Sequence, residues 1–192
     1  MAKLSWQLDP AHSEVQFRVR HLMVSTVTGQ FKNFSSNVTT AENGDFKTAE
    51  IEFTIEAASV DTGVEMRDNH LRSDDFFSAE KYPTLQFKST GLKPLGSDEY
   101  QLDGLMTIRD ITKPVSLRVE LGGVVVDPYG NTKAGFEVTG KINRKDFGLN
   151  WSAVTEAGGV VVADEVKIQA NVQYAKVQPV ATGAEVLEGA AA

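Results

Sequence analysis

The sequence contains no cysteine among its 192 residues. This absence excludes disulfide bonds, thiolate zinc sites, iron–sulfur clusters and cysteine nucleophiles, so burial of side chains must hold the fold together. Basic residues are outnumbered: 19 Lys and Arg against 26 Asp and Glu give a net charge of −7. A phosphate backbone attracts the opposite charge, and we therefore expect no nucleic-acid partner.

Long apolar runs are missing as well. The longest aliphatic runs, residues 124–126 and 160–163, fall far short of the roughly 20 residues that a membrane-spanning helix needs. The N-terminal residues reach the polar Gln7 without the apolar segment of a secretory signal peptide. We therefore expect no transmembrane segment and, from the sequence as it stands, a cytoplasmic location. The length is typical of one domain.

Apolar and polar residues alternate along much of the chain. Val15, Phe17 and Val19 alternate with polar neighbours over residues 14–20, the pattern of a strand with one buried face. Eight or nine such strands with one apolar face must close into a barrel or pack on a second sheet, because neither face nor edges can stay exposed. The further predicted strands are residues 6–8, 31–39, 50–56, 85–88, 100–109, 115–121, 133–143 and 165–174.

Residues 61–82 interrupt this alternation. Thr62 and Glu65 have the spacing of a capping box, which predicts a short helix over residues 64–73. A second helical turn is predicted over residues 21–25. Beyond Val177 the periodicity ends and Ala, Gly and Glu predominate, so we predict one domain over residues 1–177 and a flexible tail over residues 178–192.

Common catalytic and metal-binding motifs do not fit. Residues 135–141 nearly match a phosphate-binding loop, but Ile142 stands where Ser or Thr must coordinate magnesium, and the stretch alternates like a strand. The three histidines, His12, His21 and His70, are not spaced as a local ligand pair. We therefore expect no metal site and no catalytic residues.

Residues 66–77 carry an unusual concentration of polar and aromatic side chains. Arg67, Asp68 and His70 lie close together on the predicted helix, and Phe76 and Phe77 follow them. A surface helix with charge pairs, followed by two phenylalanines that plug the end of the sheet, would explain the pattern. A lid or mouth over a cavity would explain it equally well.

A series of short motifs in fixed order resembles the bacterial YceI-like family of lipocalin-like, polyisoprenoid-binding proteins. The resemblance covers about residues 4–176. Its motifs are Trp6-x-x-Asp9-Pro10-x-His12-Ser13-x-Val15-x-Phe17, His21-Leu22-Met23, Gly29-x-Phe31, Arg67-Asp68-x-His70-Leu71, Asp75-Phe76-Phe77, Tyr82-Pro83-Thr84-Leu85-x-Phe87, Gly104-Leu105-Met106-Thr107-Ile108, Thr112-Lys113-Pro114-Val115 and Gly140-Lys141-Ile142-Asn143-Arg144-Lys145-Asp146-Phe147-Gly148.

The resemblance implies an extended eight-stranded antiparallel barrel, lipocalin-like and all-β, with one or two short helices. It also implies non-catalytic binding, storage or transport of a long-chain isoprenoid lipid, of the polyprenyl or isoprenoid-quinone type. The lipid is then the bound ligand, with no cofactor besides it. A homodimer is a further expectation, and many relatives are periplasmic or secreted although this sequence shows no signal peptide.

On this interpretation the tail supplies affinity, at about 25 cal/mol per Å² of buried apolar surface, and the head group supplies orientation. Arg144 and Asp146 are weaker candidates for ligand contact, because a structural ion pair or a turn explains them better. The candidate ligand-binding residues are Phe17, Val19, Phe53, Phe87, Met106 and Phe136 inside the barrel, Met23, Phe76 and Phe77 near its mouth, and His21, Arg67, Asp68 and His70 for the head group.

Two other functions stay open at this point. An enzyme on the same barrel could act on a hydrophobic substrate, with Asp68 as base and His70 as acid. A protein-interaction module would instead have a filled core. Because a cavity lining and a packed core have the same composition, whether the interior is hollow or packed decides between these functions.

Overall fold

The computed structural model describes residues 3–177. Over this range the chain is mostly strand, with one α-helix and four short 3₁₀ helices (η). The elements follow in the order β1 (Lys3–Leu8), η1 (Pro10–His12), β2 (Glu14–His21), β3 (Ser25–Phe31), β4 (Phe34–Ala41), η2 (Phe46–Thr48), β5 (Glu50–Glu56), η3 (Ala57–Ser59), β6 (Val60–Asp61), α1 (Glu65–Arg72), β7 (Thr84–Pro94), β8 (Glu99–Ile108), β9 (Ile111–Val126), β10 (Thr132–Asn143), η4 (Arg144–Phe147) and β11 (Val162–Lys176).

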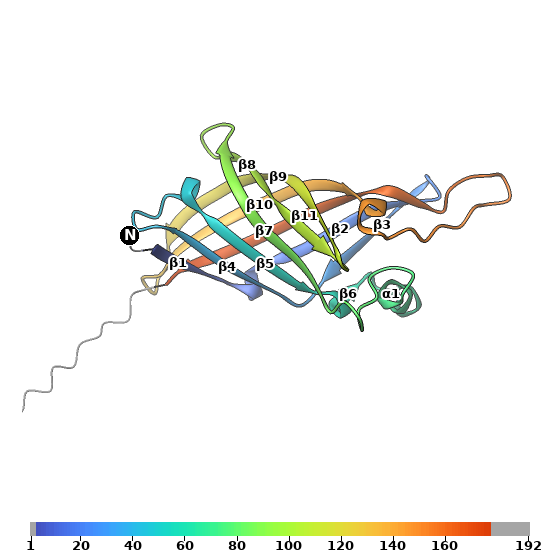
Figure 1. Ribbon diagram of the computed structural model, residues 1–192. Helices are drawn as coiled ribbons and strands as arrows, with labels where there is room; N and C mark the ends of the chain where they lie inside the picture. Colours follow the sequence, from blue (N-terminus) through green and yellow to red (C-terminus); the bar gives the residue numbers. More distant parts are fainter. Residues whose placement is uncertain (1–2, 178–192) are drawn as a thin grey trace, which may run out of the picture.

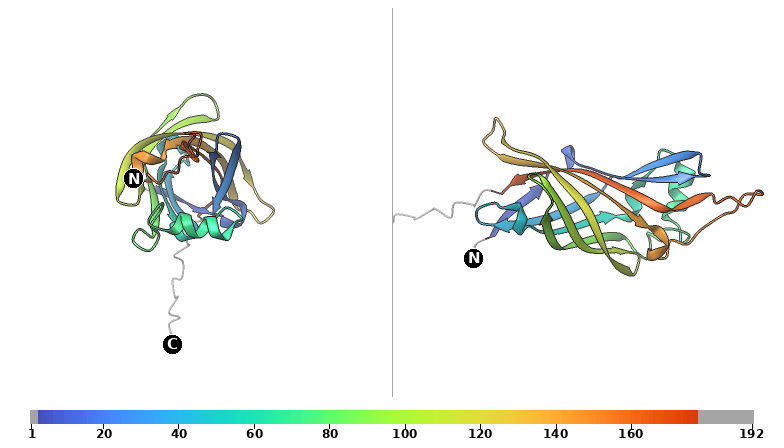
Figure 2. Two further views of the ribbon diagram at one scale, coloured as in Figure 1. Left: turned by 90° about the vertical axis from the view of Figure 1, so that its right-hand side faces the viewer. Right: turned by 90° about the horizontal axis from the view of Figure 1, so that it is seen from above.

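Within the described residues, eight of these strands close into an antiparallel barrel (Figures 1 and 2). Their order is β1-β4-β5-β7-β8-β9-β10-β11, and β1 returns to β11 where Trp6 lies opposite Lys176. β2 pairs with the preceding part of β11 and continues the sheet through β3 to β6. The predicted eight-stranded, lipocalin-like barrel with a short helix is confirmed.

The strand predictions are corrected at residues 31–39. In place of one strand, β3 ends at Phe31 and β4 begins at Phe34, and the two strands pair with different neighbours. Phe31 and Phe34 both pack into the apolar core. Because residues three apart point to opposite faces of a regular strand, the chain must bend between them.

The helical turn predicted over residues 21–25 is also wrong, because these residues join β2 to β3 in a hairpin. Leu22 and Met23 have φ angles of 51° and 57°, in the left-handed region. The N–H of Val24 bonds to the carbonyl of His21 at 3.2 Å and closes the turn. A right-handed helix needs negative φ at each of these positions.

Helix α1 confirms the helix predicted over residues 64–73. Its predicted capping box does not form, however, because the residue at the N-cap is Val64, which makes no side-chain cap. The Thr62 hydroxyl instead donates to Oδ1 of Asp68 at 2.6 Å. The helix lies at the same end of the barrel as the β2–β3 hairpin (Figure 1).

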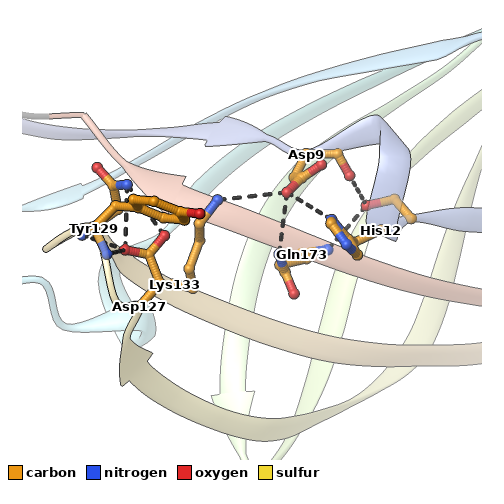
Figure 3. A network of polar contacts seen from close by, with 8 residues as sticks. Asp9, His12, Asp127, Tyr129, Lys133 and Gln173 are labelled. Atoms are coloured by element: carbon orange, nitrogen blue, oxygen red, sulfur yellow. Dashed lines mark hydrogen bonds and ion pairs between the residues drawn. The ribbon is translucent and has the colours of Figure 1, made fainter.

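A polar network joins the turn after β1 to β10 and β11 (Figure 3). Oδ2 of Asp9 lies 3.0 Å from Nδ1 of His12, 3.2 Å from Nε2 of Gln173 and 3.5 Å from Nζ of Lys133. Desolvation raises the pKa of Asp9, but hydrogen bonding and charge from His12 and Lys133 together lower it below its usual range. His12 therefore has a structural partner in Asp9.

None of the helices between residues 3 and 177 combines the length and apolar character needed to cross a lipid bilayer. The tail predicted for residues 178–192 lies outside the described residues.

Candidate functional site

The interior of the barrel is hollow in two places. A cavity of about 320 Å³ lies at the end of the barrel where α1 forms part of its lining, and we call it the α1 cavity. A second cavity of about 140 Å³ reaches toward η2, and we call it the η2 cavity. Figure 2 shows the strands encircling this interior, with α1 running along the lower edge of the barrel end that faces the viewer in its left-hand view.

The two cavities adjoin, because six side chains line both of them. We call these residues the neck. Four come from the adjacent strands β5, β7 and β8, and the other two come from β2 and β11. The neck residues are Val15, Phe53, Ile55, Phe87, Met106 and Ile168. The interior is thus a row of two chambers along the barrel.

The η2 cavity is apolar. Among the described residues, no charged side chain lines it, and its tyrosines are Tyr100 and Tyr174. The Tyr174 hydroxyl lies 2.9 Å from Oγ of Ser36, and burial, partly offset by this hydrogen bond, raises the Tyr174 pKa to about 12. The phenol is therefore neutral at physiological pH, and the chamber carries no charge.

Phe46 forms part of the wall of the η2 cavity at η2. Its ring centroid lies 4.8 Å from that of Trp6 and 4.9 Å from that of Phe136. The 3₁₀ turn that carries Phe46 is capped by Asp45, whose carboxylate accepts from the N–H of Lys47 at 2.9 Å. Aromatic packing and a capped turn together hold this wall in place.

Three rings from separate segments meet at the α1 cavity. The His70 ring lies 5.0 Å from Phe76 and 4.9 Å from Trp151, and the rings of Phe76 and Trp151 are 5.4 Å apart. Nε2 of His70 lies 2.8 Å from a carboxylate oxygen of Asp75. These contacts join α1 to the segment after it and to the segment after η4.

Arg67 is positioned through Thr62. Its Nε donates to the Thr62 hydroxyl at 2.7 Å, and its Nη2 donates to the Thr62 carbonyl at 3.0 Å. Asp68, which is 6% exposed, accepts from the N–H of Thr62 at 2.8 Å and from its hydroxyl. The carboxylate therefore fixes the threonine that in turn orients the guanidinium.

The structure brings most of the predicted ligand-binding residues to the cavity walls. Met23 and Asp68 are not among the lining residues: Met23 is 62% exposed on the β2–β3 turn, and Asp68 bonds to Thr62. Contact with a ligand stays a prediction for every candidate. The candidates that line one or both cavities are Phe17, Val19, His21, Phe53, Arg67, His70, Phe76, Phe77, Phe87, Met106 and Phe136.

Arg144 has a structural role, as its position in a predicted turn or ion pair suggested. It is 3% exposed and donates to four carbonyls, with Nη1 reaching Leu149 at 2.6 Å and Trp151 at 2.7 Å. Nε and Nη2 bond to the carbonyls of Ala163 and Val162. Burial lowers its pKa, and the charge of Asp164 opposes this. Asp146 is exposed on η4.

The sequence interpretation missed the contribution of residues 148–161. Leu149, Trp151 and Val161 from this segment line the α1 cavity. A loop has no repeating period, so no pattern could assign its side chains to a face. The one available signal for a buried position in this segment was Trp151, a large aromatic residue between two predicted strands.

No cluster of metal-ligating side chains accompanies the cavities. Among residues 3–177, no group of three His, Cys, Asp or Glu side chains is placed to hold an ion.

A family model described as the YceI-like domain matches residues 6–174. A UPF0312 protein of Staphylococcus aureus strain N315 is 36% identical over 171 residues, which cover 88% of this chain and 96% of that protein.

Solved structures show the same fold. The Campylobacter jejuni YceI protein is 32% identical, with a TM-score of 0.72 over 83% of this chain and 90% of that one. A Saccharophagus degradans domain, described as polyisoprenoid binding and implicated in plant cell wall breakdown, is 16% identical, with a TM-score of 0.67 over 91% and 99%. At that identity the likeness concerns the fold alone.

Proposed function

Because the chain belongs to the YceI-like family, we propose that it binds a long-chain isoprenoid lipid inside its barrel without transforming it chemically. The observation that supports this proposal most is the row of two chambers, the η2 cavity apolar and the α1 cavity mainly so, which suits a long and narrow apolar chain with a polar end. The Saccharophagus degradans domain described as polyisoprenoid binding shares the barrel fold, in agreement with this choice. The ligand is of the polyprenyl or isoprenoid-quinone type, and the role is storage or transport.

The tail runs from the α1 cavity through the neck into the η2 cavity. Each Å² of apolar surface that the tail removes from water contributes about 25 cal/mol. The η2 cavity has no charged group that would lose its water when the tail enters, so binding there carries no such desolvation cost. The head group stays in the α1 cavity, where His21, Arg67 and His70 line the wall. These side chains can donate hydrogen bonds to head-group oxygens.

The enzymatic alternative finds less support in the positions of its two residues. A general base must reach the proton that it removes. Asp68 is buried, and its carboxylate accepts a hydrogen bond from Thr62. It is not among the residues that line the cavities. The interaction module with a filled core is disfavoured by the hollow interior. The homodimer remains a prediction.

Addition of an isoprenoid lipid should raise the melting temperature of lipid-free protein. For this measurement the protein is unfolded in guanidinium chloride, freed of lipid and refolded. A ligand at 100 times its Kd stabilises the native state by about 2.7 kcal/mol, which corresponds to a rise of about 5–10 °C for a chain of this size. Octaprenol and an isoprenoid quinone are the probes.

The matched control is a soluble head-group analogue without a tail, which should leave the melting temperature unchanged because the tail supplies the affinity. No shift with any isoprenoid would overturn the proposed function.

A further inference from the structure

Three glycines of the barrel wall lie beneath bulky inward-facing side chains. A Cβ atom added to Gly104 would lie 2.5 Å from Cε2 of Phe87, and one added to Gly29 would lie 2.7 Å from Cε1 of Phe17. A Cβ added to Gly140 would collide with Cδ2 of Leu117. Carbon atoms at ordinary contact are about 3.5–4.0 Å apart, so each bulky side chain occupies the space that a Cβ would need.

Of these three side chains, Phe87 alone is a neck residue. Phe17 lines the α1 cavity and Leu117 lines the η2 cavity, whereas Phe87 lines both. The missing side chain of Gly104 therefore lets the Phe87 ring lie against β8. A Cβ at that position would displace the ring from the wall, into the barrel interior that it faces.

The neck has two unlike walls. One wall comes from the neighbouring strands β5, β7 and β8 and carries the large Phe53, Phe87 and Met106 beside the smaller Ile55. Phe87 lies opposite both Phe53 and Met106 in the sheet register. Val15 and Ile168, from β2 and β11, are smaller and line both chambers too. The large side chains on one wall thus decide how wide the passage is.

We propose that Gly104 determines which tail lengths the barrel accepts, by keeping the neck open between the two cavities. This inference rests on the proposed function, since it concerns the same tail. A short isoprenoid tail is buried in the α1 cavity of about 320 Å³, whereas a long tail must pass the neck to use the η2 cavity of about 140 Å³. Closing the neck therefore weakens the binding of long tails selectively.

The test compares farnesol with octaprenol on wild type and on Gly104→Ala. We expect the affinity of the variant for octaprenol to fall about tenfold or more, because about 55 Å² of buried apolar surface accounts for one factor of ten. The affinity for farnesol should change little. Gly29→Ala is the matched control: it displaces Phe17, which lines the α1 cavity, so it should weaken both ligands alike.

Gly104→Ala also brings the new Cβ within 2.7 Å of the Lys88 carbonyl oxygen, which strains the backbone. Two further variants therefore separate strain from blockage. Met106→Trp narrows the neck while position 104 remains glycine. It should give the same selective loss of affinity for octaprenol. Phe87→Leu in the Gly104→Ala background removes the displaced ring and should restore octaprenol binding.

Three results would count against the inference. Equal losses for farnesol and octaprenol in both Gly104→Ala and Met106→Trp would overturn it, as would octaprenol binding that both variants leave intact. Failure of Phe87→Leu to restore binding in the Gly104→Ala background would assign the loss to strain and overturn it too. If wild type bound neither alcohol, the proposed function itself would fail, which is a distinguishable outcome.

Discussion

Replacing Arg144 with methionine is expected to lower the free energy of unfolding by about 4 kcal/mol. The substitution keeps an apolar stem but removes every donor of the guanidinium. The carbonyls of Leu149, Trp151, Val162 and Ala163 then lose their hydrogen-bond partner in a site where Arg144 is almost fully buried. Unsatisfied buried acceptors cost about 1–3 kcal/mol each, and water entering the opened site offsets part of that.

Urea unfolding and a thermal melt measure this effect, and the melting temperature should fall by about 10 °C. The matched control is Lys145→Met on the next residue, whose ammonium forms a half-exposed ion pair with Asp164 at 3.1 Å. Such a pair contributes about 0–1 kcal/mol, so this control should stay close to wild type. An Arg144→Met protein as stable as the control would contradict the structural role assigned to the arginine.

Val166→Trp is expected to weaken octaprenol binding by about 100-fold, a loss of about 2.7 kcal/mol in binding free energy. Val166 lies on β11 opposite Ile142 and Val19, and all three line the α1 cavity. An indole at this position takes volume that the lipid needs. The hollow interior absorbs much of the added bulk, so the stability cost should stay within about 2 kcal/mol.

Lys167→Trp places the same side chain one residue further along β11, where the pleat turns it to the outer, exposed face. This control should bind octaprenol like wild type in a fluorescence titration. Equal affinities of the two tryptophan variants would show that octaprenol does not occupy the α1 cavity.

The barrel was predictable from the sequence because period-two alternation is a local signal of a strand with one buried face. β10 and β11 show this alternation over nearly their whole length, in agreement with the strands predicted over residues 133–143 and 165–174. The β2–β3 turn was not predictable in this way, because Leu22 and Met23 occupy left-handed positions that Gly or Asn usually takes.

The candidate site was predictable only in part. Phe53, Phe87 and Met106 follow from the inward face of their strands. Trp151 could not be assigned in this way, because its position depends on contacts with His70 and Phe76, residues distant in the chain. The structural role of Asp68 could not be predicted for a similar reason. Its hydrogen bonds to Thr62 depend on the fold of the chain before α1.

A barrel that carries a long isoprenoid lipid in the cell should release that lipid on solvent extraction. Protein purified from its natural host is extracted with organic solvent, and the extract is analysed by mass spectrometry. We expect an isoprenoid lipid in an amount comparable to that of the protein, and much less of it in a parallel extract of the Val166→Trp variant. An extract without lipid, from protein whose melting temperature does not respond to added octaprenol or isoprenoid quinone, would contradict the proposed function.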